Sequence, residues 1–306
     1  MAIKDVEYIK GVAVNKYYVL ILSCIIAHAM NGMNEQKTND WDANKYQKHS
    51  DLQYKAAMYA LSKISFKGNE SVLDIGSGDG RITAEIAKRV PQGSVLGIDI
   101  SPNMIEHARN NHQQDNVSFE LYDISKGKNF YDLQKQLKES HSFHVITAFS
   151  SLSWIKNQSQ AFNNIFYLLK AKGQFRAGIA HEDSPYLRAR YKMLTHDKWK
   201  DFFVDYEMPY YPSNEQTVQK LLEHAWLKPV EITKTGVPQL FATRQDFIDW
   251  MSAIPAQIDR IPLERQQEFL DDIVTEYLQE VPEKENGSIE VIIGALGIHA
   301  CPQLPW

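Results

Sequence analysis

The sequence is poor in cysteine and has no long run of either charge. Its two cysteines, Cys24 and Cys301, lie near opposite ends of the 306 residues, and neither belongs to a CxxC pair. The histidines form no cluster with the spacing of metal ligands, so we expect neither a disulfide framework nor a bound metal. The formal net charge is −5, and the absence of a long basic run argues against a nucleic-acid partner or a polybasic membrane anchor.

Long apolar runs are also scarce, and the one that stands out is YYVLILSCIIAHAM, from Tyr17 to Met30. It follows lysines and contains a small-x-small pattern around His28, which is the outline of a secretory signal peptide. It is shorter than the about 20 apolar residues that a membrane-spanning helix needs. We rank three interpretations. The first is an artefact or a non-catalytic extension that precedes the true start at Met30 or Met33. The second is a signal peptide, and the last is a membrane helix. Residues 1–32 are therefore treated as a leader or extension, and we expect a cytoplasmic protein without stable membrane insertion, with secretion as the lesser alternative.

The rest of the chain has the composition of a globular enzyme. Apolar residues make up 43% and charged residues 23%, which is ordinary for a soluble domain. At about 150 residues per domain the length allows two domains, but one elaborated α/β domain also fits. We assign residues 33–306 to one such domain.

Short apolar segments alternate with amphipathic ones from residue 70 to residue 180. The apolar segments have the length of strands, and the amphipathic ones have the period of helices. Such repeated βαβ units predict a doubly wound parallel sheet with helices on both faces, and right-handed crossovers place the carboxyl ends of its strands at one edge. The expected strands are SVLDIG, SVLGID, VSFELYD, FHVITAFSS and QFRAGIA, and the expected helices lie within Trp41–Lys67, over Asp79–Val90, from Pro102, and over Gln158–Lys170.

The alternation breaks after Ala180, where aromatic and charged residues take over. We expect His181–Tyr211 to form a lid or a helical insertion, and a pair of helices with mixed charges to follow. These segments predict a helical cap at about residues 181–215 and 240–282. The remaining expected elements are a helix over Glu215–Trp226, a strand in PVEITKTGV and a last apolar strand in GSIEVIIGALGIHA.

A glycine-rich loop joins the first of these strands to its helix. In VLDIGSGDG, three glycines stand within five residues, which permits φ > 0 and a close approach of a ligand to the main chain. Arg81 occupies the place where a dinucleotide fingerprint has glycine or alanine. Asp74 and Asp79 would repel a pyrophosphate but attract a cation. S-adenosylmethionine carries both an ammonium and a sulfonium group, so we expect its amino-acid end to lie along this loop; the alternative is that the glycines serve only a tight turn.

Acidic residues also follow the next two strands. Asp99 is placed to accept hydrogen bonds from both ribose hydroxyls, as an acid does in Rossmann enzymes, unless it caps the following helix. Asp123 is placed to bind the adenine amino group, with Ile100 and Ile124 on the two sides of the ring, unless it only forms a turn. The fourth strand ends in Phe149–Ser151, which we expect to face the methyl group.

These motifs resemble those of the class I S-adenosylmethionine-dependent methyltransferases, within them the group of trans-aconitate and juvenile hormone acid methyltransferases. The similarity runs from Trp41 to about Ala300, with VLDIGSGDG, GIDIS and the Asp123 segment as the three motifs. WDANKYQKHSDLQ resembles a helix that lies across the cofactor in this group, and FSSLSWI resembles the segment after the fourth strand. The family often has a K-P-G-G turn where this chain has KAKG, which should alter only that turn. The resemblance implies a Rossmann-like, seven-stranded sheet whose last strand is antiparallel.

The resemblance also implies the activity and the site. It implies methyl transfer to a small molecule, with a carboxylate oxygen as the leading acceptor and no general base. In the juvenile hormone enzymes the acceptor carboxylate is held by residues that match Gln53 and Trp154 by position, and His181 is a further candidate for substrate contact. Trp41, Tyr46 and Ser50 match positions on the helix across the cofactor. The residues assigned to S-adenosylmethionine are Trp41, Tyr46, Asp74, Gly76, Ser77, Gly78, Asp79, Asp99, Ile100, Met104, Asp123, Ile124, Phe149 and Ser150.

Several alternatives stay open at this point. Trp154 could be a buried wall residue, Gln53 a solvated helix residue and His181 a structural one. The acceptor could instead be a ring carbon or a carboxylate on an acyl carrier, for which lysines near residues 192–200 could provide a basic surface. The chain could also be a catalytically silent cofactor-binding protein, which a cleft filled by the aromatic residues of Asp201–Pro212 would favour.

Overall fold

The structure is a computed structural model that describes residues 6–9, 12–15, 41–126, 142–254 and 257–303. The chain divides into a unit of residues 1–39 and a unit of residues 40–306. In the first unit, β1 (Val6–Ile9) and β2 (Val12–Asn15) form an antiparallel hairpin. The predictions for Tyr17–Met30 and for Cys24 lie outside the described residues. None of the described helices is long and apolar enough to cross a membrane.

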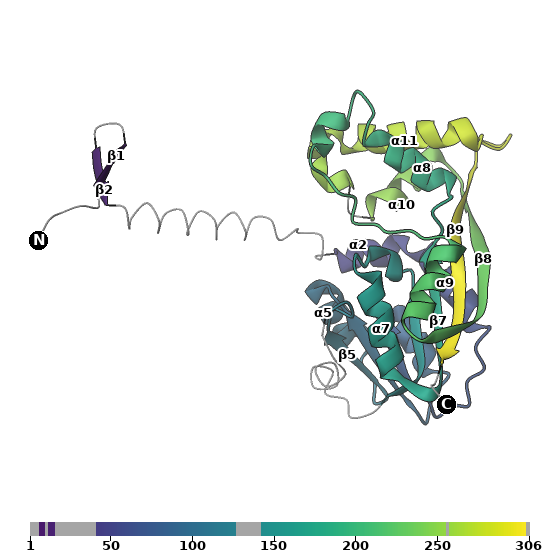
Figure 1. The fold of residues 1–306 in the computed structure, drawn as a ribbon. Helices are drawn as coiled ribbons and strands as arrows, with labels where there is room; N and C mark the ends of the chain where they lie inside the picture. The colour runs from purple at the N-terminus through teal and green to yellow at the C-terminus, as the bar shows by residue number, and fades with distance from the viewer. Residues whose placement is uncertain (1–5, 10–11, 16–40, 127–141, 255–256, 304–306) are drawn as a thin grey trace, which may run out of the picture. The chain divides into compact units, whose positions relative to one another are not determined.

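The second unit is built on one seven-stranded sheet (Figure 1). The strand order is β5-β4-β3-β6-β7-β9-β8. The first five strands of this order pair in parallel, whereas β9 is antiparallel to both of its neighbours. This confirms the predicted doubly wound sheet with an antiparallel last strand. The strands are β3 (Ser71–Ile75), β4 (Ser94–Asp99), β5 (Val117–Leu121), β6 (Phe143–Phe149), β7 (Leu169–Ala180), β8 (Leu227–Phe241) and β9 (Ile289–Pro302).

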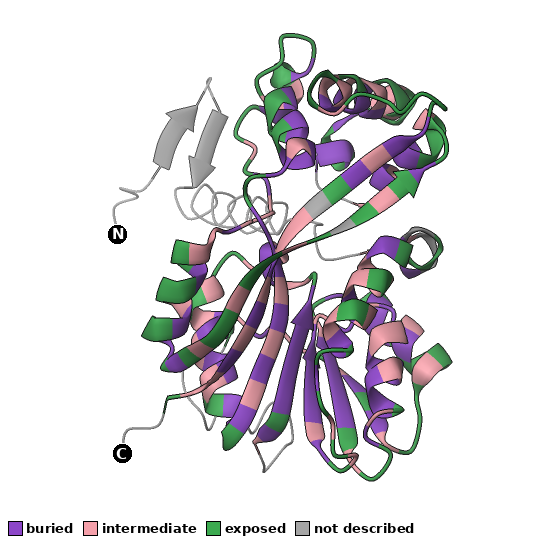
Figure 2. Cartoon of the chain, turned by 90° about the vertical axis from the view of Figure 1, so that its right-hand side faces the viewer, coloured by how far each residue is buried: buried purple, intermediate pink, exposed green. Residues whose placement is uncertain are grey.

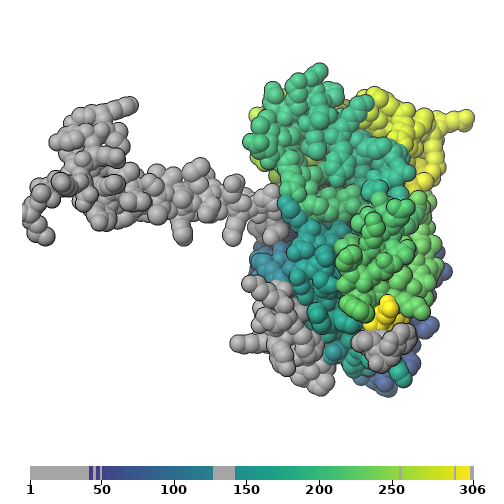
Figure 3. All heavy atoms as spheres, viewed as in Figure 1, coloured from purple at the N-terminus to yellow at the C-terminus, as the bar shows by residue number. Residues whose placement is uncertain are grey.

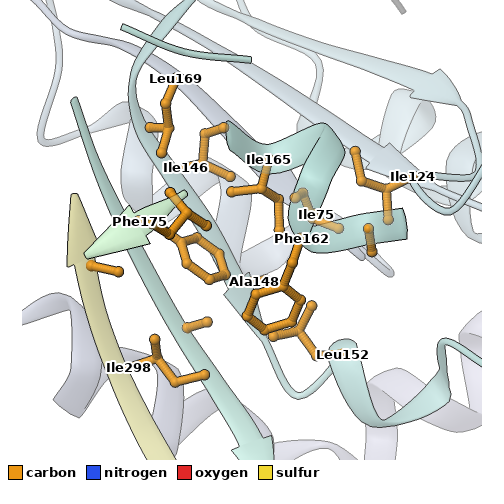
Figure 4. Close-up of a cluster of buried hydrophobic side chains, with 14 of the residues drawn as sticks. Ile75, Ile124, Ile146, Ala148, Leu152, Phe162, Ile165, Leu169, Phe175 and Ile298 are labelled. Atoms are coloured by element: carbon orange, nitrogen blue, oxygen red, sulfur yellow. The ribbon is translucent and has the colours of Figure 1, made fainter. Parts of the chain in front are cut away.

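Helices cover both faces of the sheet, because its central strands carry apolar side chains on both sides. Leu73 of β3 belongs to the core shared with α7 and α9, shown in part in Figure 4. Its neighbour Val72 belongs to the core shared with α3, α4 and α5. Alternate residues of one strand therefore anchor opposite layers of helices. The helices are α2 (Ala43–His49), α3 (Asp51–Leu61), α4 (Arg81–Ala87), α5 (Pro102–His112), α7 (Gln158–Leu168) and α9 (Glu215–His224).

One local signal of the sequence acts as expected, and one boundary differs. The Ser101 side chain caps α5 by accepting a hydrogen bond from the N–H of Met104 at 3.3 Å. The helix predicted to reach Lys170 ends at Leu168, and the strand β7 begins at once with Leu169. The reason is a break in pairing: Leu169 pairs with Phe143, and regular pairing resumes only at Gln174. The KAKG segment therefore lies within β7 as an irregularity in its pairing with β6, and it does not form a separate turn.

A helical cap with its own core follows β7. Phe247 and Phe269 are fully buried at its centre. The pairing of β9 with β7 stops at Ala295. Beyond that point β8 and β9 pair only with each other, as a two-stranded ribbon that leads from the sheet to the cap (Figure 2). The ribbon extends from the pair Gly236↔Gly294 to the pair Phe241↔Ile289. Residues that follow β7, in teal and green, form much of the visible cap surface in Figure 3. The cap elements are α8 (Pro185–Met193), η3 (Lys200–Phe203), α10 (Arg244–Ser252), η4 (Gln257–Arg260), η5 (Leu263–Arg265) and α11 (Gln266–Glu280).

Candidate functional site at the carboxyl ends of the strands

The three glycines of the loop between β3 and α4 differ in how much space a Cβ atom would have at each position. All have positive φ, at 72° for Gly76, 54° for Gly78 and 88° for Gly80. A Cβ on Gly76 would lie 2.2 Å from Cβ of Ser151, and one on Gly80 would lie 2.8 Å from Cβ of Ala108. A Cβ on Gly78 would meet only the ring of Tyr46, at 3.9 Å. Packing alone therefore explains two of the glycines, and Gly78 is the one whose backbone is open to a ligand.

Asp99 connects this loop to the end of β4. Its Oδ2 accepts a hydrogen bond from the N–H of Gly78 at 3.0 Å, and its Oδ1 accepts one from the N–H of Ser101 at 2.9 Å. Burial raises the pKa of Asp99, and these backbone hydrogen bonds oppose the rise. The side-chain cap of α5 is Ser101, so Asp99 does not serve as that cap.

Asp74 lies beneath the loop rather than on its surface. The side chain is buried, and its two oxygens accept hydrogen bonds from the hydroxyls of Thr83 at 2.6 Å and Thr147 at 2.7 Å. Burial raises the pKa of Asp74 to about 6. Because both oxygens already have protein partners, Asp74 holds α4 and β6 against β3, and its contact with the cofactor stays a prediction.

The residues expected around adenine are only partly together. Oδ1 of Asp123 accepts hydrogen bonds from the N–H and the hydroxyl of Ser125, at 2.9 and 2.7 Å, so this carboxylate also forms the turn after β5. Ile124 is buried in the core, whereas Ile100 is 40% exposed. Leu121 pairs with Asp99 in the sheet and is 52% exposed, which makes it a second apolar surface here. Sequence reasoning missed Leu121, because a leucine at a strand end looks like a core residue.

An aromatic cluster joins α2 to the segment after β6 and to the cap. The ring of Trp41 lies 5.5 Å from that of Tyr46 and 5.0 Å from that of Trp154, and Trp154 lies 4.8 Å from Tyr210, all edge to face. Burial raises the pKa of Tyr46 well above its usual value, and the carboxylates of Asp79 and Asp99 add to this rise. The structure thus brings three predicted aromatic residues together and adds Tyr210, which the sequence showed only as one of a run of aromatics.

Several buried polar atoms in this region have no protein partner among the described residues. They are Oε1 of Gln53, Oγ of Ser77 and Oδ2 of Asp79. Buried polar atoms in native proteins nearly always find a partner. Unpaired atoms in or near a loop expected to bind a ligand are therefore consistent with a bound group, and these residues fit a cofactor with an amino-acid end.

Arg81, the residue that departs from the dinucleotide fingerprint, has a positioning role. Its guanidinium donates to the carbonyl and the hydroxyl of Ser50, at 3.3 and 3.0 Å, and lies 4.3 Å from the centre of the Tyr54 ring. It therefore ties the start of α3 to the glycine loop. No local pattern in the sequence indicates this contact.

The remaining predicted residues lie around the same edge of the sheet. Ser150 has a positive φ of 60°, which is a strained conformation for a residue with a side chain. Phe149 and Met104 are buried. Nδ1 of His181 accepts from the N–H of Asp183 at 3.1 Å, and its Nε2 lies 3.4 Å from Oε2 of Glu215. Both nitrogens of His181 thus have protein partners, and its contact with substrate stays a prediction.

A mostly parallel sheet with a glycine loop after β3 and an acid after β4 is the arrangement with which many α/β proteins bind adenosine-containing cofactors at the carboxyl ends of their strands. A model of the family described as "Methyltransferase domain" matches residues 66–224. The chain belongs to this family, the S-adenosylmethionine-dependent methyltransferases, whose cofactor is S-adenosylmethionine.

Named relatives agree with this assignment. Juvenile hormone acid O-methyltransferase of Bombyx mori is 30% identical over 257 residues, which cover 79% of this chain and 86% of that protein. Trans-aconitate 2-methyltransferase of Enterobacter sp. (strain 638) is 25% identical over 260 residues, which cover 82% and 93%. The structure of phosphoethanolamine N-methyltransferase 2 from Haemonchus contortus, in complex with S-adenosyl-L-methionine, has the same fold, with a TM-score of 0.50 and 15% identity over 82% of this chain and 53% of that one. The predicted resemblance is confirmed.

Proposed function

We propose that the protein methylates a carboxylate oxygen of a small organic acid. The observation that carries this proposal is its similarity to the two relatives above, whose names give an acid or a carboxylate as the substrate. The amide of Gln53 adds to it, because its nitrogen can donate to a carboxylate and its buried oxygen has no partner among the described residues that would hold the amide in one orientation.

We assign the cofactor as follows. The ribose hydroxyls bind Asp99, which keeps acceptor sites beyond its two backbone hydrogen bonds. The adenine ring lies against the exposed Ile100 and Leu121, and the amino-acid end lies along Gly78 beside Tyr46. The remaining residues assigned to this site from the sequence stay predictions: Trp41, Asp74, Gly76, Ser77, Asp79, Met104, Asp123, Ile124, Phe149 and Ser150.

The reaction requires little general acid or base catalysis by the protein. S-adenosylmethionine supplies a methyl group that its sulfonium activates for displacement. A carboxylate attacks without first losing a proton, so no general base is needed, and the protein contributes position and the exclusion of water. We assign Gln53 and Trp154 to orient the acceptor carboxylate, with the rings of Trp41 and Tyr210 closing the site around it.

A second candidate is a silent cofactor-binding protein, and one observation favours it. Tyr210, from the aromatic run before α9, packs 4.8 Å from Trp154, where the acceptor is expected. An acyl-carrier acceptor has less support. Each of the three lysines considered for a basic surface is already paired with a carboxylate: Lys192 with Glu276, Lys198 with Asp272 and Lys200 with Asp197.

The deciding experiment is a titration of the full chain with S-adenosylmethionine, followed by transfer of a labelled methyl group to a panel of small acids, carrier-bound acids and ring compounds. Base-labile label in an organic extract would identify a methyl ester and support the proposal. Tight cofactor binding with no transfer to free acids or to carrier-bound acids would favour the silent protein. Transfer of a base-stable label to ring compounds, with none to acids, would show that carbon is the acceptor and overturn the carboxylate proposal.

We also propose that the protein acts in the cytoplasm, in keeping with Cys301 being a free thiol. Fractionation of cells that express the full chain tests this location. Recovery of the chain, shortened, in the secreted fraction would contradict it.

A further inference from the structure

The guanidinium of Arg81 holds the corner between α2 and α3. Ser50, the residue between these helices, is only 2% exposed and accepts two hydrogen bonds from Arg81, through its hydroxyl at 3.0 Å and its carbonyl at 3.3 Å. The same guanidinium lies 4.3 Å from the centre of the Tyr54 ring, and 3.4 Å from the exposed carboxylate of Asp51. An exposed ion pair contributes little, so the contacts with Ser50 and Tyr54 carry most of this attachment.

Ser50 makes these contacts in place of its usual local role. It stands at the N-cap position of α3, yet its hydroxyl makes no capping hydrogen bond. A serine at this position normally accepts a hydrogen bond from an N–H of its own helix, which stabilises the helix. Here the hydroxyl accepts from Arg81, 31 residues further along the chain. The start of α3 therefore depends on a residue beside the glycine loop.

Arg81 is equally part of that loop. It is the first residue of α4, and its N–H donates to Oδ1 of Asp79 at 3.1 Å. Oδ2 of Asp79 and Nε of Arg81 are buried and have no partner among the residues that the structure describes. Buried polar atoms in native proteins nearly always find a partner, so each residue keeps an atom on which a ligand at the loop can act.

The helix α3 extends this attachment to two other parts of the molecule. Gln53, assigned to the acceptor carboxylate, lies in its first turn. Its neighbour Leu52 is 5% exposed and belongs to the same buried cluster as Phe247 and Trp250 of the cap. Energetic coupling between sites travels through rigid elements and chains of contacts of this kind. A shift of the corner at Ser50 would therefore displace Gln53 and Leu52 together.

We propose that Arg81 is a positioning residue that transmits cofactor binding from the glycine loop to α3, so that Gln53 takes its acceptor-binding position when S-adenosylmethionine is bound. The inference rests on the proposed function in the placement of the cofactor along the loop and in the assignment of Gln53 to the acceptor. Cofactor and acceptor then bind with positive coupling, which between two sites commonly amounts to about 5- to 150-fold in affinity.

Hydrogen exchange of the full chain, measured by NMR with and without saturating S-adenosylmethionine, tests this transmission without an acceptor. The reporter is the N–H of Tyr54, which donates to the carbonyl of Ser50 at 2.9 Å. We expect the cofactor to slow its exchange about tenfold in the original chain and less than about twofold in Arg81→Met. A residue that only braces α3 would change exchange equally with and without cofactor, so an equal cofactor effect in both proteins overturns the proposal. An original chain in which the cofactor leaves this exchange unchanged overturns it as well.

Three further variants complete the test. Arg89→Met, just beyond α4, is the matched control, because its guanidinium contacts Glu85 of that helix, and it should show the full cofactor effect. Arg81→Lys keeps the charge and a donor, and should restore part of the effect. If Arg81→Met does not fold or does not bind the cofactor, Ser50→Ala decides, since it removes the hydroxyl without removing a helix cap. It should reduce the effect several-fold, and an undiminished effect there contradicts the proposal.

An acid that the protein methylates separates this proposal from the carboxylate proposal. With S-adenosylhomocysteine bound, the Kd for that acid should rise about tenfold in Arg81→Met, and an unchanged Kd overturns the role of Arg81. The exchange results may not be read from turnover: the expected exchange effect with no methylation of any acid supports transmission through Arg81 and contradicts only the carboxylate acceptor.

Discussion

The N–H of Gly78 donates a hydrogen bond to Oδ2 of Asp99 at 3.0 Å, which joins the glycine loop to the end of the neighbouring strand. The second oxygen of the same carboxylate holds the start of α5 through the N–H of Ser101. An ionised carboxylate offers about four acceptor sites, so Asp99 can keep both bonds and still accept hydroxyls. This one side chain therefore both shapes the loop and remains available to a ligand.

Asp99→Ala should abolish measurable cofactor binding. Two hydrogen bonds to a charged acceptor contribute about 1.5–3 kcal/mol each, so we expect the Kd for S-adenosylmethionine to rise at least a hundredfold in calorimetric titration. Glu120→Ala, which removes a half-buried carboxylate that lies opposite Ile98 in the sheet and pairs with Arg109, serves as the control and should bind normally. Unchanged affinity in a folded Asp99→Ala chain would remove Asp99 from the ribose site.

The glycines of the loop should separate into structural and ligand-binding positions. Gly76→Ala places a Cβ 2.2 Å from that of Ser151 and should lower the free energy of unfolding by about 3 kcal/mol, from overpacking and positive φ together. Gly78→Ala meets nothing closer than 3.9 Å, so only the backbone strain of about 1 kcal/mol should remain.

Cofactor affinity should follow a different order from stability in these variants. Gly78→Ala should weaken S-adenosylmethionine binding about tenfold or more, because its backbone is the open part of the loop. Urea unfolding and calorimetric titration of both variants give the two quantities. If Gly78→Ala loses stability like Gly76→Ala but binds the cofactor normally, the loop does not approach the ligand at Gly78.

The buried carboxyl of Asp74 should make stability depend on pH. Its pKa of about 6 in the folded protein lies above the about 3.9 expected in the unfolded chain. Between these values the folded state binds more protons, so the contribution of Asp74 to stability falls as the pH rises from about 4 to about 6. The total change is about 3 kcal/mol at most.

Asp74→Asn should remove this dependence. The free energy of unfolding of both proteins is measured in urea at pH 4.5, 5.5 and 7, and the difference between them is compared across pH. We expect the original chain to lose stability relative to Asp74→Asn as the pH rises. A difference that stays constant across this range would show that Asp74 does not titrate there.

Much of the fold could be predicted because strands such as β3 and β4 are short, mostly apolar segments with a turn signal at their ends. The cap of α5 by Ser101 and the glycine loop are likewise local features that a sequence displays. The β7 boundary was wrong because a strand that starts with an irregular pair carries polar residues that resemble a helix end. Such a boundary depends on the pairing between segments that are distant in the sequence, and the local spacing of residues does not show this pairing.

The candidate site was less predictable where its contacts come from tertiary packing. Arg81 and Ser50 are separated by 31 residues, and their hydrogen bond depends on how α3 crosses the loop. Leu121 looks like a core residue until the sheet places it beside Asp99 at an exposed edge. Asp74 was expected to attract a cationic ligand, and the sequence did not show that two threonines occupy its oxygens. Residue type identified the chemistry in these places, while burial and partners decided which atoms remain available.

Gln53→Ala should separate acceptor binding from cofactor binding. The amide is assigned to the acceptor carboxylate, so its loss should lower turnover with an acid substrate about 10- to 100-fold, the effect of one to two hydrogen bonds to a charged group. The Kd for S-adenosylmethionine should change less than twofold, and Lys55→Ala, at an exposed position of the same helix, should change neither quantity. Measurement of kcat and KM for the acid, beside calorimetry for the cofactor, distinguishes the cases. A large loss of cofactor affinity would move Gln53 from the acceptor site to the cofactor site, and its unpaired oxygen would then mark the position of the cofactor instead.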